Sequence, residues 1–568
     1  MKRRLLITAW ALLCVLAVHA IDTDVAPDNT GMDLSAQQWD RNVVMGWNLG
    51  NSLESSGGET GWGNPKTTQE MIKFVKSQGF NAIRIPVRWT EQLADETNMV
   101  VKTEWLNRVK EIVDWCLAED MYVIINVHHE AWLDRNPFNA KKAENNRKLA
   151  ALWKCIATFF RDYDQRLAFA GTNETIAIVN DQENWNKPEA EWQEVQNSYN
   201  QTFVNAVRAT GGKNYYRHIV VQTYACNGYY GLDGFTVPTD VVEERMSVEF
   251  HCYDPYEYAG SGAYYYWGKK YKDMGKTVPS SNEQTMSSYF SNISSKWKKK
   301  GLGVVLGEYG ATTHYKNDDK QTQMENQQYY YKCMVSEARK NGIAAFAWDN
   351  NAFGNGTEKF GIFRRTATSI TIGNTYSLKG ICEGAEVEYK EPDNPGGDTP
   401  TGGTVIWEGD AVLDWDKGLQ LNVAGSEFED MGKDVQLILQ YTLDYTDYNM
   451  IQFFYGDWQA NPTFIINGAT YEKEYVPSNI HGVGNGESCT SVITFEESVY
   501  KNLVQKGMFI QGHGIRLNKV LVSNPTAGIS AITFSPQASG QYYSVGGRRV
   551  AKPTKGIYIK KGRKLIVR

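Results

Sequence analysis

The sequence predicts an α/β protein, built as a (β/α)8 TIM barrel followed by an all-β sandwich domain and a small C-terminal β module. Between about residues 40 and 350, short apolar runs alternate with stretches that have the three-to-four spacing of a helix. There are eight such runs, the number of strands that closes a barrel of this kind. After residue 389 the pattern becomes turn-rich and then β-branched and aromatic, which predicts the additional β domains.

Each expected barrel strand is an apolar run that ends at or near a polar or titratable residue. The eight runs are Val43–Asn48, Ala82–Pro86, Tyr122–Val127, Leu167–Asn173, Ile219–Gln222, Met246–His251, Val304–Glu308 and Ala344–Trp348. Segments between them, such as Thr68–Gln78 and Glu104–Ala118, carry apolar residues at helical spacing. They predict helices of the outer ring.

A chain of 568 residues is longer than one hydrophobic core normally serves, so several domains are expected. The composition shifts divide it into a signal peptide at 1–20, a barrel domain at 21–388, a Pro- and Gly-rich linker at 389–404, a β-sandwich at 405–525 and a C-terminal module at 526–568. The linker reads YKEPDNPGGDTPTGGT, in which no apolar periodicity remains.

The first twenty residues have the features of an export signal. Lys2, Arg3 and Arg4 precede the apolar run Leu5–Val18, and cleavage is expected after Ala20. A membrane anchor is the alternative, but it needs about twenty apolar residues and this run has fourteen. We therefore expect a protein that is secreted or attached to the cell surface, with no membrane-spanning segment.

Charge and cysteine usage exclude several classes of function. The net charge of -6 gives no basic footprint for phosphates, so a nucleic-acid partner is not expected. After Cys14 in the leader, seven scattered cysteines remain, with no CxxC pair and no ligand-like spacing to His, so neither a metal site nor a paired disulfide framework is predicted. No cofactor is expected. The 33 Tyr and 17 Trp are an unusually large aromatic supply, and flat rings suit sugar faces.

Polar residues at the ends of the expected strands are predicted to meet in one place. In such barrels the active site is built at the C-terminal ends of the strands. The residues at these positions, spread over some three hundred residues of sequence, are Asn48, Arg84, His128, Asn173, Glu174, His251, Glu308 and Trp348.

Two of these residues fit the chemistry of glycoside hydrolysis. Cleaving a glycosidic bond with retention needs two carboxyl groups about 5 Å apart, one to protonate the leaving oxygen and one to attack the anomeric carbon. Glu174 ends the run LAFAGTNE and Glu308 ends GVVLGE. We expect Arg84 to lower the pKa of Glu308 so that it stays ionised, and we expect burial and the second carboxylate to raise the pKa of Glu174.

The remaining residues of the cluster are expected to bind the sugar. Asn173 is placed to hydrogen-bond a ring hydroxyl, and His128, His129, His251 and Tyr253 add donors around the same rim. The indole of Trp348 would form a stacking floor, which Trp62, Trp132 and Trp185 could extend. Zinc binding by His128 and His129 is disfavoured, because neighbouring residues of a strand point to opposite faces.

The motifs GWNLGNSLE, ETGWGNPKTT, IRIPVRW, VIINVHHE, AGTNE, FHCYDPY, LGEYG and FAWDNN occur in one order over residues 35 to 375. In this combination the sequence resembles glycoside hydrolase family 5, and within it the endoglucanase-rich subfamily 4. The resemblance implies that Glu174 is the acid/base and Glu308 the nucleophile. It also implies that Arg84, His128, Asn173, His251, Tyr253 and Trp348 line the cleavage subsite. Thr175 stands where the family usually has proline, so we expect the loop from Thr175 to Pro188 to be displaced.

The implied activity is that of a secreted, retaining endo-β-1,4-glucanase acting on plant cell-wall polysaccharide. A xyloglucanase, a lichenase, a β-mannanase or a xylanase on the same scaffold is the alternative, as is a non-catalytic surface glycan-binding protein, although both carboxylates are present. A metal-dependent, deacetylase-like enzyme that uses His128, His129 and His251 is a third hypothesis, and it predicts inhibition by chelators.

The second half of the chain gives weaker signals. Exposed rings such as Trp458 or Tyr455 could let the β-sandwich bind carbohydrate. The last residues, SVGGRRVAKPTKGIYIKKGRKLIVR, resemble the C-terminal sorting domains of Bacteroidetes proteins, which implies the type IX secretion machinery as a partner. A basic β-hairpin that caps the preceding domain is the alternative.

Overall fold

The structure is a computed structural model that describes residues 23–390 and 404–523, apart from 368, 416–417, 430–431, 433–434, 467–468 and 482, together with four short strands between 542 and 567. The expected signal peptide, most of the linker and the expected strand at 531–535 lie outside the described residues. The chain forms two compact units, Met1–Asp393 and Asn394–Arg568.

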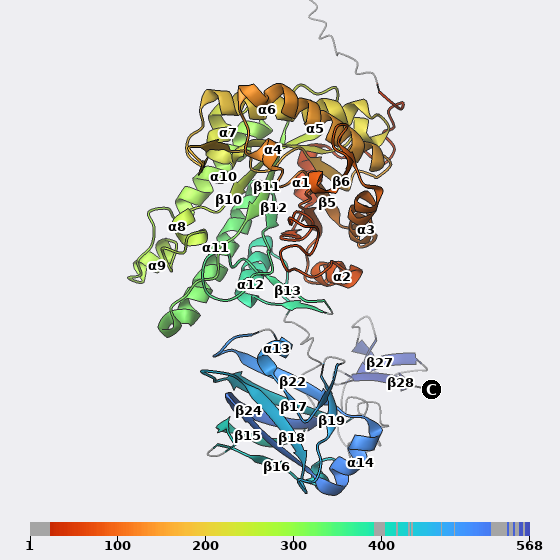
Figure 1. The fold of residues 1–568 in the computed structure, drawn as a ribbon, viewed down its shortest axis with the longest axis vertical. Coiled ribbons are helices and arrows are strands. Elements are labelled where there is room, and N and C mark those ends of the chain that lie inside the picture. The colour runs from red at the N-terminus through yellow and green to blue at the C-terminus, as the bar shows by residue number, and fades with distance from the viewer. Residues whose placement is uncertain are drawn as a thin grey trace, which may run out of the picture. The chain divides into compact units, whose positions relative to one another are not determined.

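The first unit contains the predicted closed barrel of eight parallel strands (Figure 1). The strand order around the barrel is β1-β12-β11-β10-β9-β6-β5-β2. The strands are β1 Gly46–Asn48, β2 Ala82–Ile85, β5 Tyr122–Asn126, β6 Leu167–Ala170, β9 Ile219–Asn227, β10 Met246–Cys252, β11 Gly303–Tyr309 and β12 Ala344–Ala347. All eight apolar runs of the sequence therefore supply barrel strands.

Helices surround the barrel, as the helical spacing between the strands predicts (Figure 1). The longer ones are α1 Ala36–Asn42, α2 Gln69–Ser77, α3 Thr103–Ala118, α5 Asn139–Phe159, α6 Ala190–Ala209, α10 Glu283–Lys298, α11 Lys320–Lys340 and α12 Thr375–Ala385. The shorter ones are α4 Ala131–Asp134, α7 Gly228–Gly234, α8 Tyr256–Ala259 and α9 Lys269–Asp273. Small two-stranded sheets lie in the described loops outside the barrel. They are β3 Leu93–Asp95 with β4 Val100–Val101, β7 Ala177–Val179 with β8 Gln182–Asn184, and β13 Phe363–Arg365 with β14 Ile370–Ile372.

Burial explains why these segments form strands and helices. β10 and β11 are buried at every residue, as expected for parallel strands that side chains fill on one face and helices cover on the other. In α3, Leu106, Val109 and Val113 recur at the spacing of one helix face, and all three are buried. The core of the unit is thus continuous from the barrel strands to the helix ring.

An irregularity in the barrel aligns the residues of the site. The register between β10 and β11 shifts between Phe250 and His251, so that His251 lies opposite Glu308 rather than opposite Gly307. Between β9 and β10 the register also shifts, and Ala225 and Cys226 adopt positive φ angles of 56° and 46° there. Such bulges re-aim side chains at the rims of barrels.

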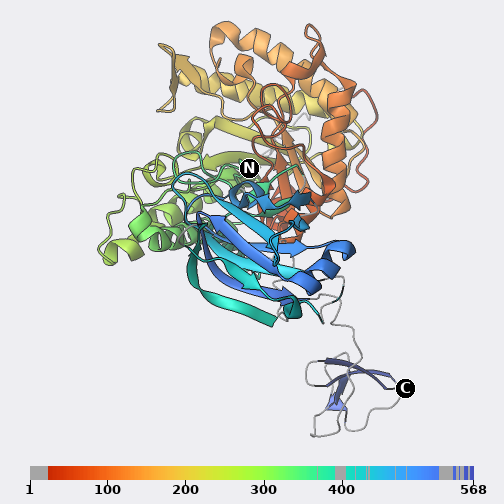
Figure 2. The ribbon, with the colours of Figure 1, turned by 60° about the horizontal axis from the view of Figure 1, so that its bottom comes forward.

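The second unit is a sandwich of a six-stranded and a four-stranded antiparallel sheet, which Figure 2 shows from a second side. The larger sheet has the order β15-β24-β17-β22-β19-β20 and the smaller one β16-β23-β18-β21. The strands are β15 Thr404–Leu413, β16 Leu421–Val423, β17 Gln436–Leu443, β18 Met450–Tyr455, β19 Thr463–Ile466, β20 Ala469–Glu472, β21 Glu474–Tyr475, β22 Ser488–Thr494, β23 Met508–His513 and β24 Ile515–Ser523, joined by α13 Pro477–His481 and α14 Glu497–Lys506.

The C-terminal segment contributes a small antiparallel sheet of order β26-β25-β27-β28. Its strands are β25 Tyr542–Ser544, β26 Arg549–Val550, β27 Gly556–Lys560 and β28 Arg563–Val567. Within the described part of the chain, no helix is long and apolar enough to cross a membrane.

Candidate active site

A cavity of about 990 Å³ opens at the C-terminal ends of the barrel strands. Seven of the residues expected to react with or bind the sugar line it, and six of these are Glu174, Glu308, His128, His129, His251 and Tyr253. Trp348 joins them from the end of β12. Side chains that are far apart in the sequence thus lie close together at the C-terminal ends of the strands.

The two carboxyl groups face each other across the base of this cavity. One oxygen of Glu174, one ring nitrogen of His251 and one oxygen of Glu308 all lie within 4.8 Å of one another. Glu308 is 5 % exposed. The spacing is in the range of about 5 Å that double displacement requires, and it is shorter than the gap that an inverting enzyme leaves for a water.

Arg84 holds three groups of the site in place. Its guanidinium lies 3.0 Å from Oε1 of Glu308 and donates hydrogen bonds to Oδ1 of Asn48 at 3.0 Å and of Asn173 at 2.7 Å. Tyr253 donates its hydroxyl to the other oxygen of Glu308 at 2.9 Å. The nucleophile candidate is thereby fixed at both oxygens, one of them by a cation.

Asn48 and Arg84 were expected to bind substrate, and the structure places both beneath the cavity. Both side chains are completely buried, and neither lines the cavity. Asn173, at 3 % exposure, is also outside the lining, and His128 lies 3.3 Å from its side-chain amide. The three residues form a supporting layer beneath the cavity because Arg84 reaches Glu308 from inside the barrel.

Glu249 is a member of the site that sequence reasoning missed. It is completely buried in β10, and one of its oxygens lies 3.0 Å from Nε of Arg84 and 3.4 Å from Nε2 of His251. Gln222 donates to its other oxygen at 2.6 Å. Burial alone would raise its pKa, but Arg84 and His251 outweigh burial and lower the pKa to about 2. A charged residue two positions before His251 in an otherwise apolar strand was the signal that could have revealed it.

The pKa values of the two candidate catalytic carboxyls are the reverse of the expectation. Burial would raise the pKa of Glu174, but a 2.7 Å hydrogen bond from His251 outweighs burial and leaves it below its ordinary value. The pKa of Glu308 is raised, first by burial and then by the charge of Glu174, in spite of His251 and Arg84. The His251 ring lies 2.7 Å from Glu174 and 3.7 Å from Glu308, which explains why it lowers the pKa of Glu174 more strongly.

The aromatic residues of the cleft separate into lining and packing groups. Trp348 stacks on His128 with ring centroids 6.2 Å apart and an interplanar angle of 13°. Trp62 and Trp185 line the cavity and are 43 % and 46 % exposed. Trp132 does not line the cavity and packs against the hydrophobic core instead.

The loop after Glu174 forms the β7–β8 hairpin. Thr175, which stands in place of the expected proline, is buried, and its carbonyl accepts from Ala225. Arg135 ties the hairpin to the acid candidate, because it pairs with Glu183 at 2.7 Å and donates to the carbonyl of Glu174 at 3.2 Å. Trp185, just beyond β8, donates to the same Glu183 at 3.1 Å.

Glu174, His251 and Glu308 also have the mutual spacing of a possible metal-ligand set. The chemistry of the three groups does not suit a cation. Although burial lowers it, the pKa of His251 lies well above its ordinary value because of Cys226, Glu308 and Glu174 around it, and a protonated imidazole cannot be a ligand. The Arg84 guanidinium already neutralises Glu308.

Comparisons with known proteins identify a family and several relatives of the chain. The sequence model of the family described as Cellulase (glycosyl hydrolase family 5) matches residues 48–354. The chain is 37 % identical over 353 residues to a xyloglucan-specific endo-β-1,4-glucanase of Bacteroides ovatus, which covers 59 % of this chain and 68 % of that protein. It is 35 % identical over 360 residues to Endoglucanase A of Ruminococcus albus, covering 61 % and 93 %.

Solved structures give the same picture. The Bacteroides ovatus GH5 xyloglucanase in complex with a XXXG heptasaccharide aligns with a TM-score of 0.59 and 34 % identity, over 64 % of this chain and 80 % of that one. A GH5-4 broad specificity endoglucanase from Clostridium acetobutylicum aligns with a TM-score of 0.55 and 34 % identity, over 61 % and 99 %.

Proposed function

The chain belongs to glycosyl hydrolase family 5, the cellulase family, and from this membership we propose that it is a retaining endo-β-1,4-glucanase that cuts internal bonds of a plant cell-wall β-glucan. The observation that carries the proposal is the pair Glu174 and Glu308, with carboxylate oxygens within 4.8 Å of each other at the base of an open cavity. Their separation selects double displacement.

In the first step Glu308 attacks the anomeric carbon through one oxygen. The bond from that carbon to the leaving oxygen breaks, and the proton of Glu174 passes to the leaving oxygen, which departs as the new chain end. In the second step water attacks the same carbon, Glu174 takes the proton of the water, and the ester bond to Glu308 breaks. Both carboxyls then return to their starting states.

The reaction needs a proton on Glu174, whose pKa the hydrogen bond from His251 lowers. We propose that bound substrate raises the pKa of Glu174 and so favours the proton there. The sugar displaces water from the cleft, Arg84 and Tyr253 then remain as the partners of the Glu308 carboxylate, and the leaving oxygen offers Glu174 a new hydrogen-bond acceptor. The proton therefore belongs to the pair and is assigned to one member by the ligand.

Xyloglucan is the second candidate substrate, and the relative from Bacteroides ovatus favours it. We also propose export through the leader at 1–20, as for an enzyme whose substrate lies outside the cell. For the final step of export we propose the type IX machinery, supported by the resemblance of the last residues to sorting domains.

The test measures product release and anomeric configuration on β-1,4-glucan, xyloglucan, mixed-linkage glucan, mannan and xylan. We expect hydrolysis of a β-1,4-glucan backbone with the β-anomer formed first, as followed by NMR. Glu308→Gln should remove activity, and azide should restore part of the activity of Glu174→Ala on an aryl cellobioside, whose phenolate leaves without a proton. Equal release by wild type and Glu308→Gln, or the α-anomer as first product, would refute the assignment.

A further inference from the structure

The four-stranded sheet of the second unit has one face in the core and one face outside it. Ile451 and Phe453 of β18 and Ile510 of β23 belong to the core, so the residues between them point outward. We call this outer surface the ring face. Its members on the two central strands are Met450, Gln452, Phe454, Phe509, Gln511 and His513.

Three rings gather at one end of the ring face. Trp458 is 44 % exposed, and its ring lies 4.9 Å from that of Phe454 and 4.6 Å from that of Phe509. The interplanar angles are 34° and 32°. None of the three packs in the core of the unit. They therefore present a flat apolar surface to solvent, whereas aromatic rings of a core are buried.

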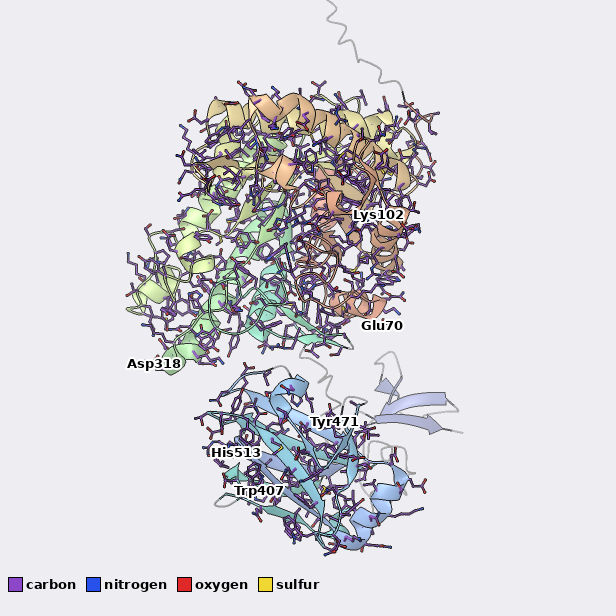
Figure 3. The ribbon with its side chains drawn as sticks, in the orientation of Figure 1. Glu70, Lys102, Asp318, Trp407, Tyr471 and His513 are labelled. Atoms are coloured by element: carbon purple, nitrogen blue, oxygen red, sulfur yellow. The ribbon has the colours of Figure 1, made fainter. Side chains whose placement is uncertain are left out.

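A second ring group lies further along the same strands, at His513 (labelled in Figure 3). Tyr448, which is 42 % exposed, stacks on His513 at 4.5 Å, and Trp415 stacks on it at 5.4 Å. His513 pairs with Met450 and Phe509 pairs with Phe454, four residues apart along the strand. The two groups are thus separated by about 13 Å, which is longer than one sugar ring.

The stretch between the two ring groups is polar. Gln511 donates to Oε1 of Gln452 at 2.9 Å, and Gln452 donates to Oε2 of Glu474 at 2.8 Å. Asn422 is exposed and pairs in register with Phe509. Amides that are held in a row offer both donors and acceptors, as a chain of sugar hydroxyls requires.

We propose that the ring face binds a β-1,4-glucan chain, as a site distinct from the catalytic cleft. The C–H faces of the sugars stack on the two ring groups, and their hydroxyls bond to the amides between them. Charges of both signs border the strip, because Lys473 lies over the Phe454 ring while Glu474 and Asp447 bond to Gln452 and His513, and a neutral glycan suits this balance. The choice of β-1,4-glucan over another neutral glycan rests on the function proposed above.

Binding here would hold the enzyme on its polymer. Because the two units are joined in one chain, capture of a glucan by the ring face raises the concentration of neighbouring glucan at the cleft. A short soluble substrate cannot engage both sites, so the gain is specific to polymers. Trp458 was a sequence candidate for this role, whereas Tyr455, the other one, is 6 % exposed and belongs to the core.

The test compares full-length proteins by affinity electrophoresis in gels that contain hydroxyethylcellulose, with glycogen gels as the control polysaccharide. Glu308→Gln serves as the parent so that the polymer survives. Adding Trp458→Ala should weaken retention by hydroxyethylcellulose about fivefold, and Trp458→Phe should keep most of it. Val405→Ala, on the other sheet and 43 % exposed, is the matched control and should not change retention.

In the active background, Trp458→Ala should keep wild-type hydrolysis of a soluble aryl-cellobioside and lose activity on insoluble cellulose. Retention equal to that of the parent would overturn the ring-face proposal. If Trp458→Ala keeps the retention of the parent but melts at a lower temperature, the proposal is also overturned. The ring of Trp458 would then pack against another part of the chain and would not be available to a glycan. A weaker retention in a protein that hydrolyses no β-glucan would support the ring face while refuting the proposed hydrolysis.

Discussion

Gly307 and Glu249 lie against each other in neighbouring barrel strands, and a Cβ atom added to residue 307 would lie 1.8 Å from Oε1 of Glu249. The glycine before the nucleophile candidate therefore makes room for a buried carboxylate. That carboxylate in turn holds Arg84 and lies near His251. The local sequence LGE thus combines a reacting group with the space for the residue that supports it.

The first prediction concerns this space. Gly307→Ala should push Glu249 away from Arg84, lower kcat about a hundredfold, and destabilise the barrel by roughly 1–3 kcal/mol through overpacking. Steady-state kinetics and thermal melting measure the two effects. Gly484→Ala, where an added Cβ has no neighbour closer than 3.9 Å, is the control and should leave both unchanged. Wild-type kcat in Gly307→Ala would show that Glu249 does not need its position.

The second prediction concerns the charge of Glu249. Glu249→Gln keeps the shape but removes a negative charge 3.4 Å from His251, so the pKa of His251 should fall. The alkaline limb of the kcat/KM profile should then move to lower pH, with kcat reduced about tenfold and KM nearly unchanged. Glu59→Gln removes another buried carboxylate, which pairs with Arg108, and should lower stability without moving the limb. An unmoved limb in Glu249→Gln would exclude this role.

The third prediction concerns the hairpin beside the acid candidate. Trp185 is 46 % exposed and lines the cavity, so we expect it to stack on a sugar of the leaving group. Trp185→Ala should raise KM for polymeric glucan up to about tenfold with a smaller effect on kcat, and Trp185→Phe should recover part of the loss. If both variants keep the wild-type KM, the hairpin does not contact substrate.

The fourth prediction concerns stability at the other end of the barrel. Asp40 is buried near the starts of β10 and β11, where it accepts from Ser247 and from the backbone of Val304, and burial raises its pKa to about 8. Between about pH 4 and pH 8 the folded protein keeps a proton that the unfolded chain releases, so stability should fall as pH rises through this window.

Asp40→Asn should remove this pH-dependent loss, which is of the order of a few kcal/mol, and raise the melting temperature more at pH 8 than at pH 5. Activity should be unchanged because Asp40 is remote from the cleft. Asp162→Asn, at an exposed position, is the control. An identical pH dependence in wild type and Asp40→Asn would contradict the assignment.

The fifth prediction concerns metals. Glu174, His251 and Glu308 have suitable spacing, but the protonated His251 and the Arg84 contact oppose cation binding. Dialysis against EDTA should leave kcat and the melting temperature unchanged, and added zinc should not increase activity. Loss of activity that zinc restores would favour the metal-dependent alternative.

Much of the fold could be read from the sequence, because each barrel strand is a short apolar run whose residues are buried from both sides. The runs that end in Glu174 and Glu308 predicted strands followed by titratable residues. Because active sites of such barrels lie at the C-terminal ends of the strands, the two residues were expected close together. The motif order gave the family. These inferences depend on local periodicity and on a topology that has few variants.

Other features required the three-dimensional structure. Arg84 was expected in the cleft but lies beneath it, since depth inside a barrel depends on side chains from several strands at once. Glu249 was missed because its partners, Arg84 and Gln222, are distant in the sequence. The pKa order of Glu174 and Glu308 depends on which carboxyl His251 contacts, and a bulge between β10 and β11 decides that.

The sequence by itself therefore determined the strands, the family and the two carboxyl groups, because hydrophobic periodicity and chemical type are properties of neighbouring residues. Only the tertiary structure decided which groups line the cavity, which lie beneath it, and that Trp458 joins Phe454 and Phe509 on an outer face while Tyr455 is buried. Contact, burial and electrostatic coupling arise between residues that the chain separates, and strand register and packing bring them together.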